Sequence, residues 1–494
     1  MKSKKNEIYQ NKTGEVYTPE FIVNNILDQV GYIHSEPIFN YQIIDNSCGQ
    51  GAFLLKIVER FLSSSKLFNL SENEIVSKLE SNVHGVDIEI ESVKIAIKSL
   101  DYLVEKNGIL KKVKWDVKYG NSLEISKFNG KMDFVVGNPP YIRIHDLNFE
   151  FKKFKFATQG MIDLYLIFFE LGIEMLNEKG KLGYITPNSF FTSSSGLIMR
   201  KFLIENKMLS KMVNLRHFNP FKGVVTYPAV TILETNHASN NMEYYTYDEK
   251  NKKPLFSSKL PYKELWLNNC FYFDSVKNLI DFKKIVNTKI REDFDVKNGV
   301  STNLDSFFYN QDYTGKYISK AYKASTGNYT KVFFPYDSNL NTVTLKEIKI
   351  NNKEMHSNLY SFKPQLEKRS LQSQKWYEFA RTQGIKDINK KRFAINSIIR
   401  SIDSIKIREI EEGCVIYSGL YILDENRNFE FYKNIICEQE FINYLKILGK
   451  DKNGEYYSFS SIDLKKYLSF KINQLEIIRN KENKNVTEFI NWKK

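Results

Sequence analysis

The sequence predicts an α/β fold with an open, mostly parallel sheet, followed by an α+β domain. Short apolar runs that end in Asp or Asn alternate with amphipathic helical segments over the first 240 residues. A glycine-containing turn joins the first of these runs to its helix. The chain has 494 residues, more than the roughly 250–300 at which a single core stops growing. We therefore expect two domains, residues 1–240 and 241–494.

The first expected helix begins at Thr18-Pro19, after a polar segment over residues 1–13. Thr18 is expected to be its N-cap, and Pro19 fits the first helical position, where no backbone N–H is needed. Apolar residues then recur at helical spacing, which predicts one buried face: Ile22, Val23, Ile26, Leu27 and Val30.

Two strand–helix units follow. Residues 42–44 predict a buried strand that ends at Asp45, and the turn over residues 46–51 leads into a helix. Leu54 stands where the dinucleotide fingerprint has its third glycine, which disfavours NAD. A second strand over residues 83–86 ends at Asp87. An acidic residue there favours a contact to a ribose diol, and a cap of the next helix is the alternative role.

Two more strands complete a row of polar tips. The third, residues 113–119, leads to Asn121, and the fourth, residues 134–136, is closed by Gly137. The fourth delivers Asn138-Pro139-Pro140-Tyr141, and two prolines cannot continue a sheet ladder, so a stiff loop must begin here. An amide oxygen and a backbone carbonyl on this loop could accept both hydrogens of an NH2 group beside a stacking phenol ring. Because ligands bind at the carboxyl ends of parallel strands, the four tips predict one shared crevice.

Basic charge is concentrated late in the chain. The net charge is +14, of which the first 240 residues supply only +3, while residues 316–400 hold 17 basic and six acidic side chains. Together with many aromatic residues this favours a polyanion partner over an ordinary Lys-rich surface. The four cysteines form no CxxC pair, and no apolar stretch is long enough to span a bilayer. We expect a soluble cytoplasmic protein with no metal.

The motifs resemble those of the gamma-class, TaqI-like N6-adenine DNA methyltransferases of type II restriction-modification systems. The resemblance covers residues 14 to about 235, in the order 14–19, 45–53, 85–87, 120–123 and 138–141. Residues 163–165, 182–187 and 221–233 match as well. It implies a Rossmann-like domain that binds S-adenosyl-L-methionine. The residues that correspond to its cofactor contacts are Tyr17, Thr18, Pro19, Asp45, Ser47, Cys48, Gly49, Gly51, Asp87, Ile88, Asn121, Ser122 and Asn138.

The resemblance also implies the roles at the target base. Asn138 and Pro139 would hold the N6 amine of an adenine flipped out of the duplex, and Pro140 completes the catalytic tetrapeptide. Tyr141 would stack on that base. A second stacking ring comes from Phe221, with Phe218 as the alternative. Many relatives have Asp at the position of Asn121, where an Asn can both donate and accept.

Residues 241–494 are then expected to recognise the DNA target. Residues 376–384 resemble a "W-Y-x-F-x-R-x-Q" stretch of such recognition domains. Arg381 and Gln383 in this stretch could read base edges, and phosphate contact or internal hydrogen bonding are equal alternatives for them. Phosphate contacts are expected from exposed basic residues: Lys368, Arg369, Lys375, Lys390, Lys391 and Arg392. The implied partners are double-stranded DNA and a separately encoded restriction endonuclease, with the chain itself a monomer. Methylation of a ribosomal RNA guanine amine or of a protein glutamine amide is the alternative function.

Overall fold

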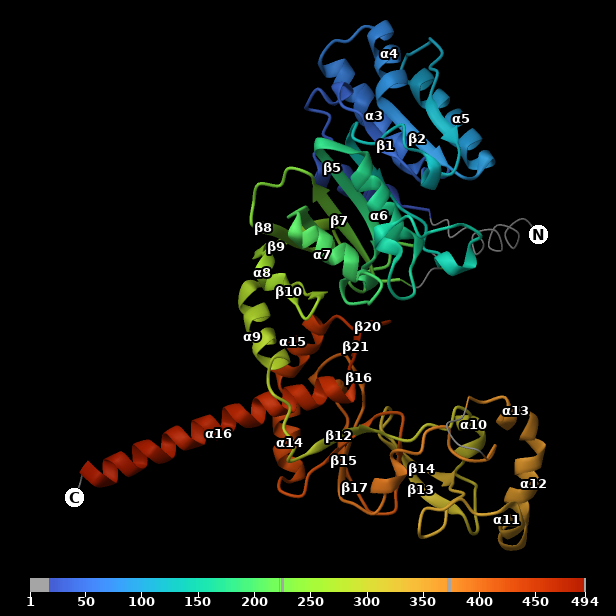
Figure 1. The fold of residues 1–494 in the computed structure, drawn as a ribbon, viewed down its shortest axis with the longest axis vertical. Coiled ribbons are helices and arrows are strands. Elements are labelled where there is room, and N and C mark those ends of the chain that lie inside the picture. The colour runs from blue at the N-terminus through green and yellow to red at the C-terminus, as the bar shows by residue number, and fades with distance from the viewer. Residues whose placement is uncertain (1–16, 222, 224–225, 371–374, 493–494) are drawn as a thin grey trace. The chain divides into compact units, whose positions relative to one another are not determined.

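The structure, a computed structural model, describes residues 17–221, 223, 226–370 and 375–492, with side chains up to residue 480. The motif residues Gly14, Glu15 and Val16 lie outside this range. The chain divides into two compact units, residues 1–280 and 281–494. The expected boundary at 240/241 is too early, because the next two strands extend the sheet of the first unit. Figure 1 shows the elements of each unit.

The first unit is built on a nine-stranded sheet in the order β3-β2-β1-β4-β5-β7-β6-β8-β9. The first five strands of this order run parallel, as predicted, and β7 pairs antiparallel with both β5 and β6. The strands are β1 (Ile43–Asp45), β2 (Val83–Asp87), β3 (Asp116–Tyr119), β4 (Met132–Gly137), β5 (Leu176–Pro187), β6 (Leu209–Asn214), β7 (Pro228–Glu234), β8 (Asn241–Asp248) and β9 (Lys253–Pro261). A short hairpin follows, formed by β10 (Trp266–Leu267) and β11 (Cys270–Phe271).

Helices cover both faces of this sheet. The α-helices are α2 (Glu20–Val30), α3 (Ala52–Leu67), α4 (Glu72–Asn82), α5 (Ile90–Lys106), α6 (Leu164–Met175), α7 (Leu197–Glu205), α8 (Tyr262–Leu265) and α9 (Val276–Val286), the last of which spans the boundary between the units. Gly183 of β5 faces Ile26 and Val30 of α2, whereas Leu182 and Tyr184 face Gly172 of α6. Since successive residues of a strand point to opposite faces, α2 and α6 lie on opposite sides of β5.

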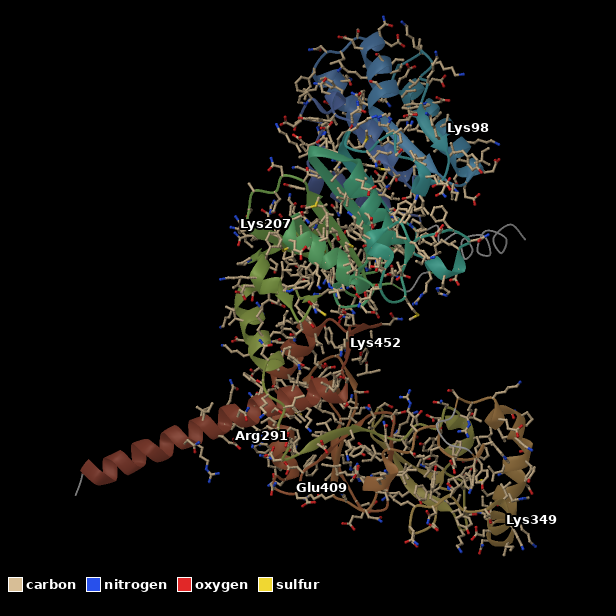
Figure 2. All side chains as sticks on the ribbon, viewed as in Figure 1. Lys98, Lys207, Arg291, Lys349, Glu409 and Lys452 are labelled. Atoms are coloured by element: carbon tan, nitrogen blue, oxygen red, sulfur yellow. The ribbon has the colours of Figure 1, made fainter. Side chains whose placement is uncertain are left out.

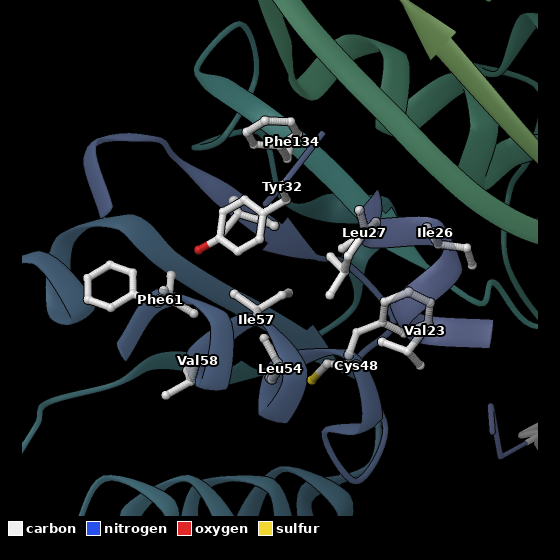
Figure 3. Packing of buried hydrophobic residues seen from close by; sticks show 14 of the residues in the cluster. Val23, Ile26, Leu27, Tyr32, Cys48, Leu54, Ile57, Val58, Phe61 and Phe134 are labelled. Atoms are coloured by element: carbon white, nitrogen blue, oxygen red, sulfur yellow. The ribbon is translucent and has the colours of Figure 1, made fainter. Parts of the chain in front are cut away.

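The core on the α2 side joins α2, α3, α4 and α5 to the sheet. All five apolar residues predicted for the face of α2 are buried. Figure 3 shows part of this packing, with Leu54 and Ile57 of α3 between Cys48 and Tyr32. Leu54, which departs from the dinucleotide fingerprint, lies where a Cβ on Gly85 would meet its methyl group at 2.9 Å.

The second unit is α+β, as the sequence predicts. It contains a four-stranded antiparallel sheet and two three-stranded sheets. The strands are β12 (Asp295–Asn298), β13 (Ile318–Lys323), β14 (Asn328–Phe333), β15 (Arg392–Ile395), β16 (Ile398–Ile399), β17 (Ile407–Ile410), β18 (Val415–Tyr417), β19 (Leu420–Leu423), β20 (Asp451–Lys452) and β21 (Tyr456–Ser458). The helices are α10 (Asp305–Phe308), α11 (Leu345–Asn351), α12 (Lys353–Ser361), α13 (Lys363–Glu367), α14 (Phe429–Ile436), α15 (Gln439–Leu448) and α16 (Ser461–Trp492). Over the described residues, no helix is both long and apolar enough to cross a membrane.

Candidate active site

The four polar strand tips lie at one edge of the sheet. Strands β3, β2, β1 and β4 are neighbours and run parallel. Asp45 and Asp87 are the last residues of β1 and β2, and Asn121 and Asn138 come shortly after the ends of β3 and β4. The backbone ties the tips together, since Gly120 N–H donates to the Asp87 carbonyl at 2.9 Å. The convergence predicted from the sequence is therefore present in the structure.

The turn after β1 connects two of these tips. Gly49 N–H donates to Asp87 Oδ2 at 2.7 Å, and Asp87 Oδ1 accepts from Glu89 N–H at 2.9 Å. Gly49 and Gly51 have φ angles of 48° and 92°, which residues with a side chain rarely adopt. A Cβ on Gly51 would also lie 3.1 Å from the Cβ of Ala96. Burial raises the pKa of Asp87 despite these hydrogen bonds, so a polar ligand would restore solvation that the carboxylate has lost.

Asp45 is the most deeply buried acid of the site, with 1% of its surface exposed. Its Oδ1 accepts the Ser47 N–H at 3.1 Å. Burial raises the pKa of its carboxyl to about 8, and the charge of Asp87 adds to this effect. The Oγ of Ser47 is also buried and has no hydrogen-bond partner among the described residues. An uncompensated acid beside an unsatisfied hydroxyl is a site suited to a cationic, hydrogen-bonding ligand.

Three of the other predicted cofactor residues occupy different environments. Asn121 caps a short 3-10 turn, where its Oδ1 accepts the Leu123 N–H at 3.1 Å, so its NH2 is the end left for another partner. Ser122 is buried and donates its hydroxyl to the Asn46 carbonyl at 2.6 Å. The side chain of Cys48 belongs to the hydrophobic core (Figure 3). The cofactor contact that the resemblance implies for Cys48 stays a prediction.

Asn138 is held at both ends of its amide. Its Nδ2 donates to Thr18 Oγ1 at 3.0 Å, and its Oδ1 accepts the Tyr141 hydroxyl at 2.6 Å. The same hydroxyl lies 3.1 Å from the Ile185 carbonyl of β5. Burial raises the pKa of Tyr141 well above its usual value, so the phenol stays a donor. Thr18 was expected to cap α2, but that helix has no side-chain cap and its N-cap residue is Pro19.

The aromatic partner of Tyr141 is Phe221. The two ring centroids are 6.1 Å apart in an edge-to-face arrangement, and Phe221 is buried. Phe218, the alternative, stacks on Tyr247 at 5.1 Å instead. This geometry favours Phe221 as the second stacking ring, and its role stays a prediction. Tyr17 and Ile88, which were predicted to contact the cofactor, have exposed side chains.

The sequence pointed to no role for three residues around this site. Tyr165 of α6 packs its ring edge-to-face against Tyr141, with centroids 6.4 Å apart. Tyr184 of β5 donates to Asn46 Oδ1 at 2.8 Å and so braces the turn after β1. Gly137 leaves room for Asp45, because a Cβ there would lie 2.8 Å from Asp45 Oδ1. These contacts join separate strands and helices, and a single sequence carries no signal for them.

In the second unit, two of the predicted DNA contacts are structural instead. Arg392 is 1% exposed and donates to the carbonyls of Lys390, Ile388 and Cys414 at 3.1, 2.9 and 2.7 Å. Arg369 donates to four backbone carbonyls, and burial lowers its pKa to about 10. Arg369 thus uses four of its five N–H donors within the unit, and the guanidinium of Arg392 is buried, so neither is placed as the exposed phosphate contact that was expected. For these two residues the prediction is wrong.

The other predicted DNA contacts are placed differently. Lys368, Arg381, Gln383, Lys390 and Lys391 are exposed, and Lys375 is partly buried against the Thr342 carbonyl. Lys391 pairs with Glu409 at 3.0 Å. Within residues 376–384, Tyr377 and Phe379 precede Arg381 and are buried in the hydrophobic core. Other lysines, such as Lys349, project from the surface of this unit (Figure 2). The exposed residues stay predictions for DNA binding.

Substitution of a buried arginine and of an exposed lysine should have different effects on the free energy of unfolding. We expect Arg392→Ala to lower the free energy of unfolding of the second unit by about 3 kcal/mol or more, because it leaves several buried carbonyls unsatisfied. Lys391→Ala, the matched control, removes only an exposed ion pair and should change it by less than about 1 kcal/mol. Chemical denaturation of the full chain measures both. Equal stability of the two variants would contradict the structural role of Arg392.

Part of this chain is similar to known proteins. Residues 81–221, which include Asp87, Asn121, the tetrapeptide and Phe221, match the Eco57I restriction-modification methylase family. The type II methyltransferase M.BstVI of Geobacillus stearothermophilus is 30% identical over 48% of this chain and 44% of its own length. The type II restriction enzyme and methyltransferase RM.Eco57I of Escherichia coli is 26% identical over 65% of this chain and 37% of its own length.

The chain thus spans less than half the length of these curated methylases. A solved structure of the type IIL restriction-modification enzyme MmeI in complex with DNA superposes with a TM-score of 0.57 at 14% identity, covering 89% of this chain and 64% of that one. At this identity the likeness concerns the fold alone. It extends beyond the first unit, since 89% of the chain includes much of the second unit.

Proposed function

We propose that this chain is a site-specific DNA methyltransferase that acts on the N6 amine of adenine. It would be the modification component of a restriction-modification system, working as a monomer beside a separately encoded endonuclease. The observation that carries the proposal is the Asn138 amide, placed next to Tyr141 and Phe221 at the edge that also carries Asp45 and Asp87. The similarity of residues 81–221 to a family of restriction-modification methylases supports the same activity.

The residues at the strand tips fit S-adenosylmethionine. The buried Asp45 carboxyl and the unsatisfied Ser47 hydroxyl suit its ammonium and carboxylate groups, and Asp87 suits its ribose hydroxyls. The Asn121 NH2 is available for the adenine ring. When bound, the cofactor supplies an electrophilic methyl group on a sulfonium. Glycines at 49 and 51 keep the backbone of the turn open to such a ligand.

The tetrapeptide would activate the target amine. The lone pair of an adenine N6 is delocalised into the ring, which makes it a poor nucleophile. Asn138 Oδ1 and the Pro139 carbonyl would accept its two hydrogens and favour a localised lone pair on the nitrogen. Pro140 has no N–H and leaves that carbonyl without a competing neighbouring donor. Stacking on Tyr141 and Phe221 would offset the roughly few kcal/mol needed to flip the base out of the duplex.

The second unit would recognise the DNA site. Its basic excess lies in residues 316–400, and the exposed Arg381 and Gln383 have the donor and acceptor groups for guanine and adenine edges. Lys368, Lys390 and Lys391 would contact phosphates, so DNA affinity should fall with rising salt. Long-read sequencing of the genome of a host that expresses the chain tests site specificity. We expect N6-methyladenine at one recurring sequence, absent with Asn138→Ala; unmethylated DNA in both cultures would contradict the proposal.

Cofactor binding should depend on pH through Asp45. With a pKa of about 8, its carboxyl is mostly protonated at pH 6 and must lose that proton to pair with the cofactor ammonium. Affinity should therefore rise with pH, by at most about tenfold per pH unit, between about pH 6 and 7.5. Isothermal titration calorimetry of wild type and Asp45→Asn measures the slope. The same slope in both proteins would assign the pH dependence to another group.

A further inference from the structure

Thr18 lies at the start of α2 but does not serve that helix. It is 3% exposed, and α2 begins after Pro19 without any side-chain cap. Its hydroxyl lies instead 3.0 Å from Asn138 Nδ2, which belongs to a residue 120 positions later in the chain. The buried hydroxyl of Thr18 thus bonds a side chain of the catalytic loop instead of capping α2. This arrangement indicates that the hydroxyl has a function at that loop.

The reason lies in the two unlike ends of an amide. Only Oδ1 of Asn138 can accept a hydrogen from a target amine, while Nδ2 in that place would set donor against donor. In the structure the NH2 end is bonded to Thr18 Oγ1 and the oxygen end accepts the Tyr141 hydroxyl at 2.6 Å. Because Tyr141 is the stacking ring of the proposed site, its hydroxyl marks the end of the amide that faces the base.

We propose that Thr18 is a positioning residue for the catalytic amide. Its hydroxyl anchors the NH2 end of Asn138 and so keeps Oδ1 toward the target amine. This inference rests on the proposed methyl transfer, and it adds a role to the cofactor contact that the family resemblance implies for Thr18. The role concerns the rate of transfer and not the affinity for the cofactor.

A carboxylate at position 138 would not need this anchor. Its two oxygens are equivalent acceptors, so either end can face the amine. The loss of the Thr18 hydroxyl should therefore matter when residue 138 is Asn and matter little when it is Asp. A purely structural role of Thr18, or a contact to the cofactor alone, predicts the same effect in both backgrounds.

The experiment compares Thr18→Val, which removes the hydroxyl at similar size, with Thr18→Ser, which keeps it. Methyl transfer to unmethylated duplex DNA gives kcat, calorimetry with S-adenosylmethionine gives Kd, and thermal melting confirms folding. We expect T18V to lower kcat roughly 10- to 100-fold, the cost of an unsatisfied buried group. Its Kd should change less than about threefold, and T18S should keep kcat within about threefold of wild type.

The second part of the experiment repeats Thr18→Val in a chain that carries Asn138→Asp. There T18V should lower kcat by less than about threefold relative to N138D alone. The proposal is overturned by an unchanged kcat in T18V, by a weaker Kd with kcat retained, or by an equal loss in both backgrounds. If N138D is inactive, the T18V and T18S pair decides alone. Wild type is assayed first, so a failure to methylate adenine would count against the proposed function and not against Thr18.

Discussion

Asn138→Ala should lose methyl transfer by at least about 10²- to 10³-fold, the range seen when one preorganised group at a reacting centre is removed. The variant lacks the oxygen that accepts the Tyr141 hydroxyl and, in the proposed reaction, the target amine. Cofactor binding should change little, because Asp45 and Asp87 belong to the neighbouring strands β1 and β2. Initial rates on duplex DNA and calorimetric titration of the cofactor measure the two effects separately.

The control for this variant is Asn129→Ala, another asparagine of the same unit, with an exposed side chain in a surface turn. It should transfer methyl groups at the wild-type rate. If cofactor affinity falls in parallel with the rate in N138A, Asn138 contributes to cofactor binding and not to binding of the target amine.

Gly137→Ala should damage cofactor binding and catalysis together. An added Cβ would lie 2.8 Å from Asp45 Oδ1 and 3.6 Å from its Cγ, where nothing can be accommodated without movement. Asp45 is buried and already bonded to the Ser47 backbone, so β4 and the loop after it must shift. Overpacking of this kind costs about 1–3 kcal/mol, which corresponds to a roughly 5- to 150-fold weaker cofactor affinity. Calorimetry checks this value.

Gly120→Ala is the matched control, at the tip of β3 in the same sheet. Its nearest neighbour would be a methyl carbon of Ile125 at 3.4 Å, an ordinary contact. We expect G120A to bind the cofactor several-fold better than G137A. If the two variants bind equally well, the space beside Asp45 is not what position 137 provides.

The strand tips were predictable because their signals are local. Two apolar runs stop at Asp45 and Asp87, and a pair of prolines follows Asn138. These local signals mark the strand ends without any knowledge of the tertiary structure. Parallel order then follows from alternating strands and helices, so the shared edge could be inferred from one sequence. The apolar face of α2 followed from helical spacing in the same way.

Contacts that depend on tertiary structure were not predictable. The motif at Thr18-Pro19 fits a helix cap, and only the folded chain brings its hydroxyl to Asn138. Arg369 and Arg392 have the composition of a DNA-binding surface, yet the fold turns both onto their own backbone carbonyls. The domain boundary was expected between residues 240 and 241, but β8 pairs with β6 and keeps the next residues in the first unit.

The decisive test of adenine methylation is transfer of a labelled methyl group from S-adenosylmethionine to duplex DNA, followed by nucleoside analysis. We expect the label to be recovered as N6-methyladenine with the wild-type protein and to be absent with Asn138→Ala. Label recovered in 4-methylcytosine would contradict the choice of amine. Label recovered only in RNA or protein, from reactions that offer all three substrates, would contradict DNA as the substrate.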